Sequence, residues 1–101
     1  MKNKTTFADF KKMLNSAIVH KMKMKTTVVN KNGEIVREND FAPVHRTQSN
    51  AFTLLRNEKE SWIEYGKASE WDFTNSTGII KSMGDGGKMI LNFEDNTFFG
   101  L

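Results

Sequence analysis

The sequence predicts an α+β fold: an N-terminal amphipathic helix packed on a small antiparallel β-barrel or bent sheet. Helical periodicity of apolar residues occurs in one segment, near the N-terminus. The rest of the chain divides into short segments rich in strand-forming residues, which are separated by turn residues. No part of the chain alternates strand with helix, which argues against parallel βαβ units. The length of 101 residues suits a single domain, residues 1–101.

The predicted helix spans about residues 6–22. Thr6 is the expected N-cap, and Asp9, three residues further on, completes a variant of the capping box. Lys11 and Lys12 lie on the face that points to solvent. The opposite face is an apolar stripe at helical spacing, which comprises Phe7, Phe10, Leu14, Ala17, Ile18 and Met22.

Antiparallel strands are predicted over about residues 24–99. The clearest local signal is "VVNKNGEIV", in which Asn32 and Gly33 are the preferred pair for a two-residue type I′ turn. The flanking residues are strand formers, so this segment predicts a β-hairpin. With a two-residue loop, Val29 is expected to lie opposite Val36.

Further turn residues divide the remaining strands. Pro43 is expected to end the second strand or to mark an edge, because it has no backbone N–H to donate to a ladder. Gly66 and Lys67 separate "ESWIEY" from "SEWDFT", and "GDGG" connects "GIIKSM" to "KMILNFE". The C-terminal "NTFFGL" is expected to add an edge strand.

The strand pattern over roughly residues 24–74 resembles that of SH3-like and Sm-like barrels. "VHRTQSNAFTLL" is similar to the bent second and third strands of such barrels. "ESWIEYGKASEWDF" is similar to their fourth strand, tight turn and fifth strand. The resemblance implies an SH3-like or Sm-like barrel. It transfers no site residue, because the Asp/Asn pair with which that family binds RNA has no match in this chain.

Composition limits the class of protein. Apolar residues make up 38% and charged residues 27% of the chain, which is typical of a globular domain. There is no cysteine, so disulfides and thiol chemistry are excluded. No apolar run reaches the roughly 20 residues of a membrane-spanning helix, and the lysine-containing N-terminus lacks the apolar region of a secretory signal. We therefore expect a cytoplasmic protein with no membrane partner.

Charge is distributed unevenly along the chain. Residues 1–25 carry seven lysines and one acid, a balance of +6, whereas residues 58–101 carry four lysines and eight acids, a balance of −4. The basic end offers a candidate phosphate-binding surface, and a nucleic-acid-binding β-barrel is therefore the alternative function. Its predicted contact residues are Lys11, Lys12, Lys21, Lys23 and Lys25.

The stretch from Glu60 to Phe73 holds both tryptophans and the only tyrosine, together with four acidic residues. On a strand, Trp62 and Glu64 share one face while Ile63 and Tyr65 share the other. Trp71 is assigned to the core. For the rest, two interpretations are open: a purely structural cluster, or an exposed aromatic anchor at Trp62 or Tyr65. The predicted protein-binding residues are Trp62, Glu64, Tyr65, Glu70 and Asp72.

Catalytic and metal-binding patterns are weak. Glu64 could form a general acid/base pair with Glu70 or Asp72 on adjacent strands, which leaves a small enzyme as a third possibility. The two histidines, His20 and His45, are too few for a zinc site. "GDGGK" departs from a phosphate-binding loop in the spacing of its glycines. No catalytic residue, metal or cofactor is predicted.

The predicted function is that of a small non-catalytic binding protein, a regulator or inhibitor that docks on another protein. A second copy of the chain is left open as a partner. Twelve lysines against three arginines, with ten asparagines, indicate AT-rich codons, which suits a phage or mobile-element gene.

Overall fold

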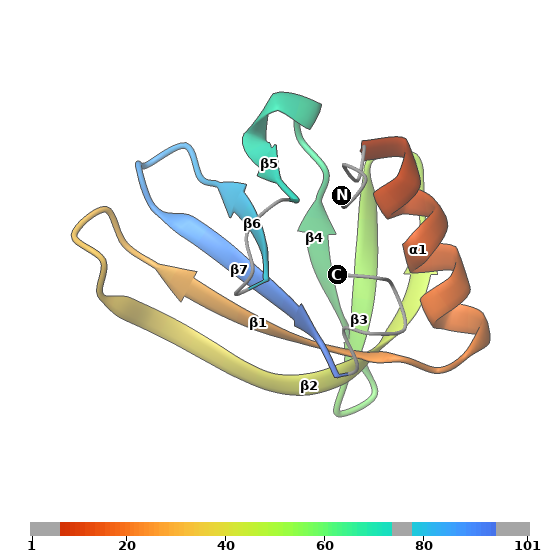
Figure 1. Ribbon diagram of the computed structural model, residues 1–101. Coiled ribbons are helices and arrows are strands. Elements are labelled where there is room, and N and C mark those ends of the chain that lie inside the picture. The colour runs from red at the N-terminus through yellow and green to blue at the C-terminus, as the bar shows by residue number, and fades with distance from the viewer. Residues whose placement is uncertain (1–6, 74–77, 95–101) are drawn as a thin grey trace.

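The computed structural model describes residues 7–73 and 78–94. In this part of the chain, a single α-helix, α1 (Phe7–Val19), packs on a seven-stranded antiparallel sheet, which confirms the α+β class (Figure 1). A short 3₁₀ turn spans Ala68–Glu70. The strands are β1 (Lys23–Val29), β2 (Ile35–Thr47), β3 (Ala51–Arg56), β4 (Lys59–Glu64), β5 (Trp71–Asp72), β6 (Ile79–Ser82) and β7 (Lys88–Phe93).

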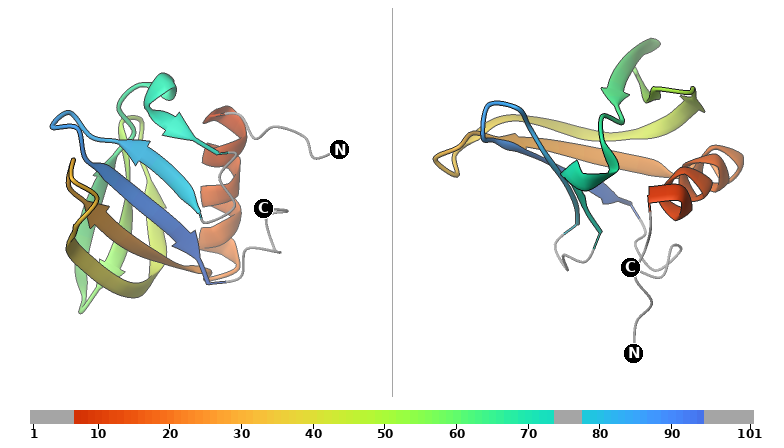
Figure 2. Two further views of the ribbon diagram at one scale, coloured as in Figure 1. Left: turned by 60° about the vertical axis from the view of Figure 1, so that its left-hand side comes forward. Right: turned by 90° about the horizontal axis from the view of Figure 1, so that it is seen from above.

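The sheet is bent but not closed. Its strand order is β4-β3-β2-β1-β7-β6-β5, so β4 and β5 are the two edges. Figure 2 shows the β3–β4 hairpin and the β5–β6–β7 strands standing on different sides of the long β1–β2 ribbon. A closed SH3-like or Sm-like barrel is therefore not confirmed. No described helix is long and apolar enough to cross a bilayer.

Strand β2 belongs to two ladders. Its first part pairs with β1, ending at the pair Lys23↔Pro43, and its second part pairs with β3, beginning at Val44↔Leu54. The prediction that Pro43 ends the strand or marks an edge is wrong, because β2 continues through it to Thr47 between two neighbours. The missing N–H of Pro43 is tolerated there because one ladder stops and the other starts at this point. At the bend, the carbonyl of Asp40 accepts a hydrogen bond from Arg56 Nη1 at 2.6 Å.

Helix α1 buries the predicted stripe. Phe10, Leu14 and Ala17 are each 0% exposed, as the periodicity predicts. The helix ends at Val19 rather than at 22, because the backbone turns left-handed at Lys21 (φ 55°). Met22 N donates to Ala17 O at 2.8 Å and Lys21 N donates to Ile18 O at 3.2 Å, the paired bonds of a Schellman motif. Thr6, the predicted N-cap, lies outside the described residues.

The core lies between α1 and the concave side of the sheet. Phe10 is at its centre: its ring centroid lies 4.9 Å from that of Trp71, 5.3 Å from Phe73 and 5.9 Å from Phe52. Trp71 is 8% exposed, which confirms its structural role. Its indole Nε1 donates to Tyr65 O at 2.7 Å, so the polar atom of this buried ring is satisfied. Other buried core residues are Met24, Val44, Leu54, Ile63, Ile79, Leu91 and Phe93.

The β1–β2 hairpin has the predicted position but not the predicted register. Asn30 N donates to Glu34 O and Gly33 N donates to Asn30 O, so the loop has three residues, 31–33, and Val29 pairs with Ile35. Gly33 has the positive φ that the predicted type I′ turn requires, at 86°. Asn30 Oδ1 also accepts from Asn32 N and Glu34 N at 2.9 and 3.0 Å. These bonds favour the longer loop because they satisfy the backbone N–H groups inside the turn.

A two-residue hairpin turn occurs instead between β3 and β4. Arg56 pairs with Lys59, and the two residues between them, Asn57 and Glu58, have φ values of 49° and 67°. Positive φ at both loop positions is the signature of a type I′ turn. The sequence "NEK" suits a hairpin loop between Arg56 and Glu60, and the structure confirms the hairpin, with Lys59 as the first residue of β4 rather than part of the loop.

The chain turns away from β4 after Tyr65. Gly66 (φ 61°) and the 3₁₀ turn redirect it, so β5 pairs with β6 rather than with β4. The predicted separation of the two segments at Gly66 and Lys67 is confirmed, but the tight turn that the barrel resemblance implies between β4 and β5 is absent. The predicted hairpin around "GDGG" is confirmed, since β6 and β7 pair from Ser82↔Lys88. The strand expected in "NTFFGL", and the remainder of the predicted strand region up to about residue 99, lie outside the described residues.

Candidate functional site

The candidate site is the outer face of β2, β3 and β4 around Trp62. Pairing places Arg46 of β2, Thr53 of β3 and Trp62 of β4 in one row across the three strands. Trp62 is 51% exposed, whereas its neighbours Ile63 and Tyr65 are 6% and 3% exposed. The predicted alternation along β4 is thus confirmed. We call the set Arg46, Glu60, Trp62 and Glu64 the Trp62 face.

An ion pair orders the charged part of the Trp62 face. Arg46 donates from Nε to Glu60 Oε2 at 2.6 Å and from Nη2 to Glu60 Oε1 at 2.8 Å, a two-point contact between planar groups. Thr53 Oγ1 lies 3.1 Å and His45 Nε2 lies 3.6 Å from Glu60 Oε2. The Arg46 guanidinium carbon is 5.6 Å from the centroid of the Trp62 ring, within cation–π range.

These contacts favour the charged form of both side chains, the Glu60 carboxylate and the Arg46 guanidinium. The hydrogen bond from Arg46 lowers the pKa of the Glu60 carboxyl below its usual value. The same hydrogen bond raises the pKa of the Arg46 guanidinium. The pair is exposed to solvent, so its contribution to stability is small, and its main effect is to fix the guanidinium beside the indole ring.

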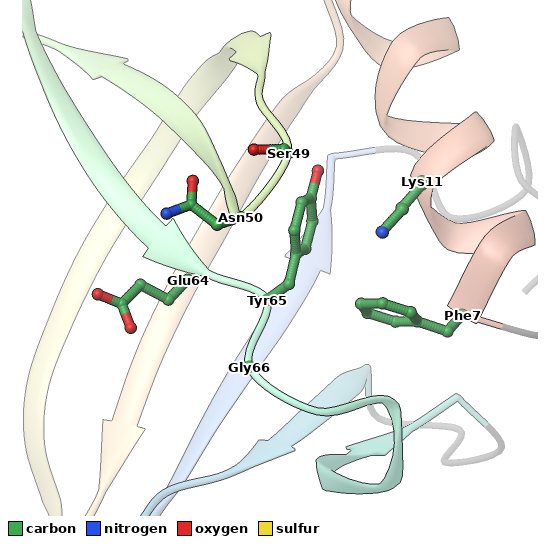
Figure 3. A pocket seen from close by; sticks show the side chains of 7 residues that line it. All are labelled: Phe7, Lys11, Ser49, Asn50, Glu64, Tyr65 and Gly66. Carbon is green, nitrogen blue, oxygen red and sulfur yellow. The ribbon is translucent and has the colours of Figure 1, made fainter.

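A pocket of about 370 Å³ lies where β4 ends. The first turns of α1, the β2–β3 turn and the end of β4 form its walls, and Figure 3 shows Lys11 pointing toward the rings of Phe7 and Tyr65. Lys11 Nζ is 4.6 Å from the Phe7 ring centroid and 4.9 Å from that of Tyr65. Burial raises the pKa of the Tyr65 hydroxyl. The full lining is Phe7, Lys11, Ser49, Asn50, Glu64, Tyr65 and Gly66.

The structure places the predicted protein-binding residues in different parts of the fold: on β4, in the segment after it and on β5. Trp62 and Glu64 are exposed on β4, but Tyr65 is buried and contributes a wall of the pocket. Glu70 Oε1 accepts a hydrogen bond from Lys67 N at 2.7 Å, in the loop that leaves β4. Asp72 is exposed on β5, at the other end of the strand order.

The expectation that Glu64 lies on a strand adjacent to that of Glu70 or Asp72 is wrong. The cause is the 3₁₀ turn at 68–70, which contains Glu70 and carries the chain to β6 instead of back along β4. No carboxylate pair across neighbouring strands is therefore formed by these residues. Among residues 7–73 and 78–94, no cluster of three potential metal ligands occurs.

The five lysines predicted as a nucleic-acid surface are spread over α1, the turn that follows it and β1. Lys12 is exposed in the first half of α1, Lys21 lies beyond its C-terminus, and Lys23 is exposed at the start of β1. Lys11 is in the pocket, and Lys25 Nζ lies 3.6 Å from Glu38 Oε2. Two of the five are thus engaged within the chain.

Sequence reasoning missed Arg46 and Glu60 as partners of Trp62. A register shift between Val44 and Arg46 brings Arg46 into the row of Thr53 and Trp62, and a bulge of this kind is not visible in the sequence. The available signal was compositional: arginine and tryptophan are the residue types most enriched at binding hot spots.

Comparison of the chain with protein-family models, with curated proteins and with solved structures finds no significant match. Function is therefore inferred from the geometry of the chain itself.

Proposed function

We propose that this protein is a non-catalytic regulator or inhibitor that docks on another protein through the Trp62 face. The observation that carries the proposal is an exposed tryptophan, 51% accessible, beside an arginine that is already held in place. Tryptophan and arginine dominate the binding energy of measured interfaces, where they fill the desolvated centre of the contact.

The Arg46 side chain is already held in place in the free protein, and this favours a role in docking. The two hydrogen bonds to Glu60 and the contact with the indole ring restrict the Arg46 side chain before any partner arrives. Restricting a long side chain in advance lowers the entropy lost on binding, which is about 0.5–1.5 kcal/mol for each flexible side chain. Glu60 and Glu64 supply the polar rim that surrounds a typical hot spot.

The test compares two exposed apolar side chains on different parts of the sheet. Tagged wild-type protein, Trp62→Ala and the control Ile35→Ala are used to capture partners from a lysate of the source organism. Ile35 is 62% exposed at the tip of the β1–β2 hairpin, so it matches Trp62 in accessibility but not in position. Circular dichroism first verifies that both variants are folded.

We expect Trp62→Ala to weaken the captured partner's affinity by at least about thirtyfold, or 2 kcal/mol, while Ile35→Ala binds as wild type. Equal binding by wild type and Trp62→Ala would contradict the proposal. Retention of nucleic acid that is abolished by replacing Lys12, Lys21 and Lys23 and that weakens steeply with salt would favour the nucleic-acid alternative.

A further inference from the structure

The backbone of β4 has one free edge. In a two-residue hairpin the flanking residues, here Arg56 and Lys59, form a hydrogen-bonded pair, and such pairs recur at every second residue along the ladder. Lys59, Ser61 and Ile63 therefore direct their N–H and C=O groups toward β3. Tyr65 N continues the series by donating to Asn50 O at 3.0 Å.

The alternate residues of β4, namely Glu60, Trp62 and Glu64, consequently direct their backbone groups away from β3. No strand follows β4 in the order of the described sheet, so these groups form an open ladder. The side chains of the same three residues lie on the Trp62 face. One extended segment could thus contact the free backbone edge and the Trp62 face together.

One side chain of this edge, the Glu64 carboxylate, favours a basic residue on the occupant. Glu60 is neutralised by Arg46, but Glu64 is exposed and makes no ion pair with a described residue. On a strand placed beside β4, every second side chain would lie on the Trp62 face, next to Glu64 and the indole ring. A lysine or arginine there would pair with the Glu64 carboxylate while its aliphatic stem packs on the ring.

A second copy of this chain fits the edge poorly. Antiparallel self-pairing centred on Trp62 would place Glu60 of each copy directly opposite Glu64 of the other. Glu64 would then face a carboxylate that is already paired with Arg46, so the charge of Glu64 would stay uncompensated. Acidic side chains on an edge strand are also a common device against self-association.

We propose that β4 accepts an extended, basic segment of the partner protein as an additional strand, with lysine or arginine at alternate positions facing Glu64 and Trp62. This inference rests on the proposed function and adds to it the class of partner and the binding mode. The backbone of the segment would supply affinity through the open ladder, and the Trp62 face would supply selectivity.

The experiment selects displayed random ten-residue peptides on the wild-type protein, with counter-selection on Trp62→Ala. Enriched peptides are then synthesised in two forms, one unmodified and one N-methylated at alternate amides, and titrated by ¹H–¹⁵N NMR. We expect enrichment of lysine or arginine at alternate positions and shifts centred on the amides of 60, 62 and 64. N-methylation of the ladder-forming amides should weaken binding by at least about tenfold, since it removes backbone hydrogen bonds and blocks strand approach.

A charge-reversed variant provides the second measurement. Glu64→Lys should bind the basic peptides several-fold more weakly, and a peptide whose basic residues are replaced by glutamate should regain the lost affinity. The inference is overturned if no peptide is enriched, if enriched peptides lack alternating basic residues, or if N-methylation has no effect. Because the capture experiment with Trp62→Ala does not depend on peptides, docking through the Trp62 face can stand when strand addition fails, and the two failures are distinguishable.

Discussion

Replacement of Leu14 by alanine tests whether α1 is an integral part of the core. The side chain of Leu14 is 0% exposed and belongs to the cluster that includes Phe10 and Phe52. The substitution removes three carbon atoms, which at about 0.8 kcal/mol for each buried carbon group lowers the free energy of unfolding by about 2.4 kcal/mol. A residual cavity adds about 24 cal/mol per Å³, so incomplete collapse brings the total to about 3–4 kcal/mol.

The measurement is equilibrium unfolding in urea, followed by circular dichroism, with the slope of the transition fitted for each variant. Val19→Ala is the matched control, because Val19 lies in the same helix and is 76% exposed. We expect the control to change the free energy of unfolding by less than about 0.5 kcal/mol. A loss below about 1 kcal/mol for Leu14→Ala, at unchanged slope, would refute the packing of α1 on the sheet.

Three further predictions concern single side chains. Lys21→Gly should raise the free energy of unfolding by about 0.5–1 kcal/mol, because glycine adopts the left-handed conformation at the end of α1 without strain; urea unfolding that shows a loss would contradict this. Burial raises the pKa of Tyr65, so stability should be complete below the ordinary tyrosine pKa and decline as pH rises through the native value. Tyr65 is the only tyrosine, so its ultraviolet absorbance should show a titration at higher pH in the folded than in the urea-unfolded protein. The lowered pKa of Glu60 means that its stabilising effect is present above the ordinary glutamate pKa and lost as pH falls through the native value. Glu60→Gln should therefore destabilise the protein at neutral pH, and the difference from wild type in thermal unfolding should disappear in acid; a constant difference would count against the Arg46 contact.

The helix was predictable because its signal is local. The spacing of Phe10, Leu14 and Ala17 identifies one buried face, whichever strands lie beneath it. The end of α1 was not predictable, because Lys21 adopts a backbone conformation that usually requires glycine.

The sheet was predictable in its strands but less so in its pairing. The alternation of Trp62 with Ile63 assigns the faces of β4 correctly, since it depends on sequence parity alone. The partner of β5 depends on the direction in which the chain leaves Gly66, and the position of Arg46 depends on a register shift. Both are decided by packing between distant segments, so the row that forms the Trp62 face could not be derived from the sequence.

The membership of β2 in two ladders has a consequence for cooperativity. If the β1–β2 ladder separates, the first part of β2 loses its hydrogen bonds. The backbone of β2 continues without a turn into the part that pairs with β3, so the loss affects the β2–β3 ladder as well. The amide of Val44, which donates to Met22 O at 3.1 Å, lies at the joint between the two ladders. It should therefore exchange its hydrogen only when the whole molecule unfolds, while the amides near Ile35 at the hairpin tip exchange through local fraying. Because β2 belongs to both ladders, the β3–β4 strands and the β1–β7–β6–β5 strands should unfold together.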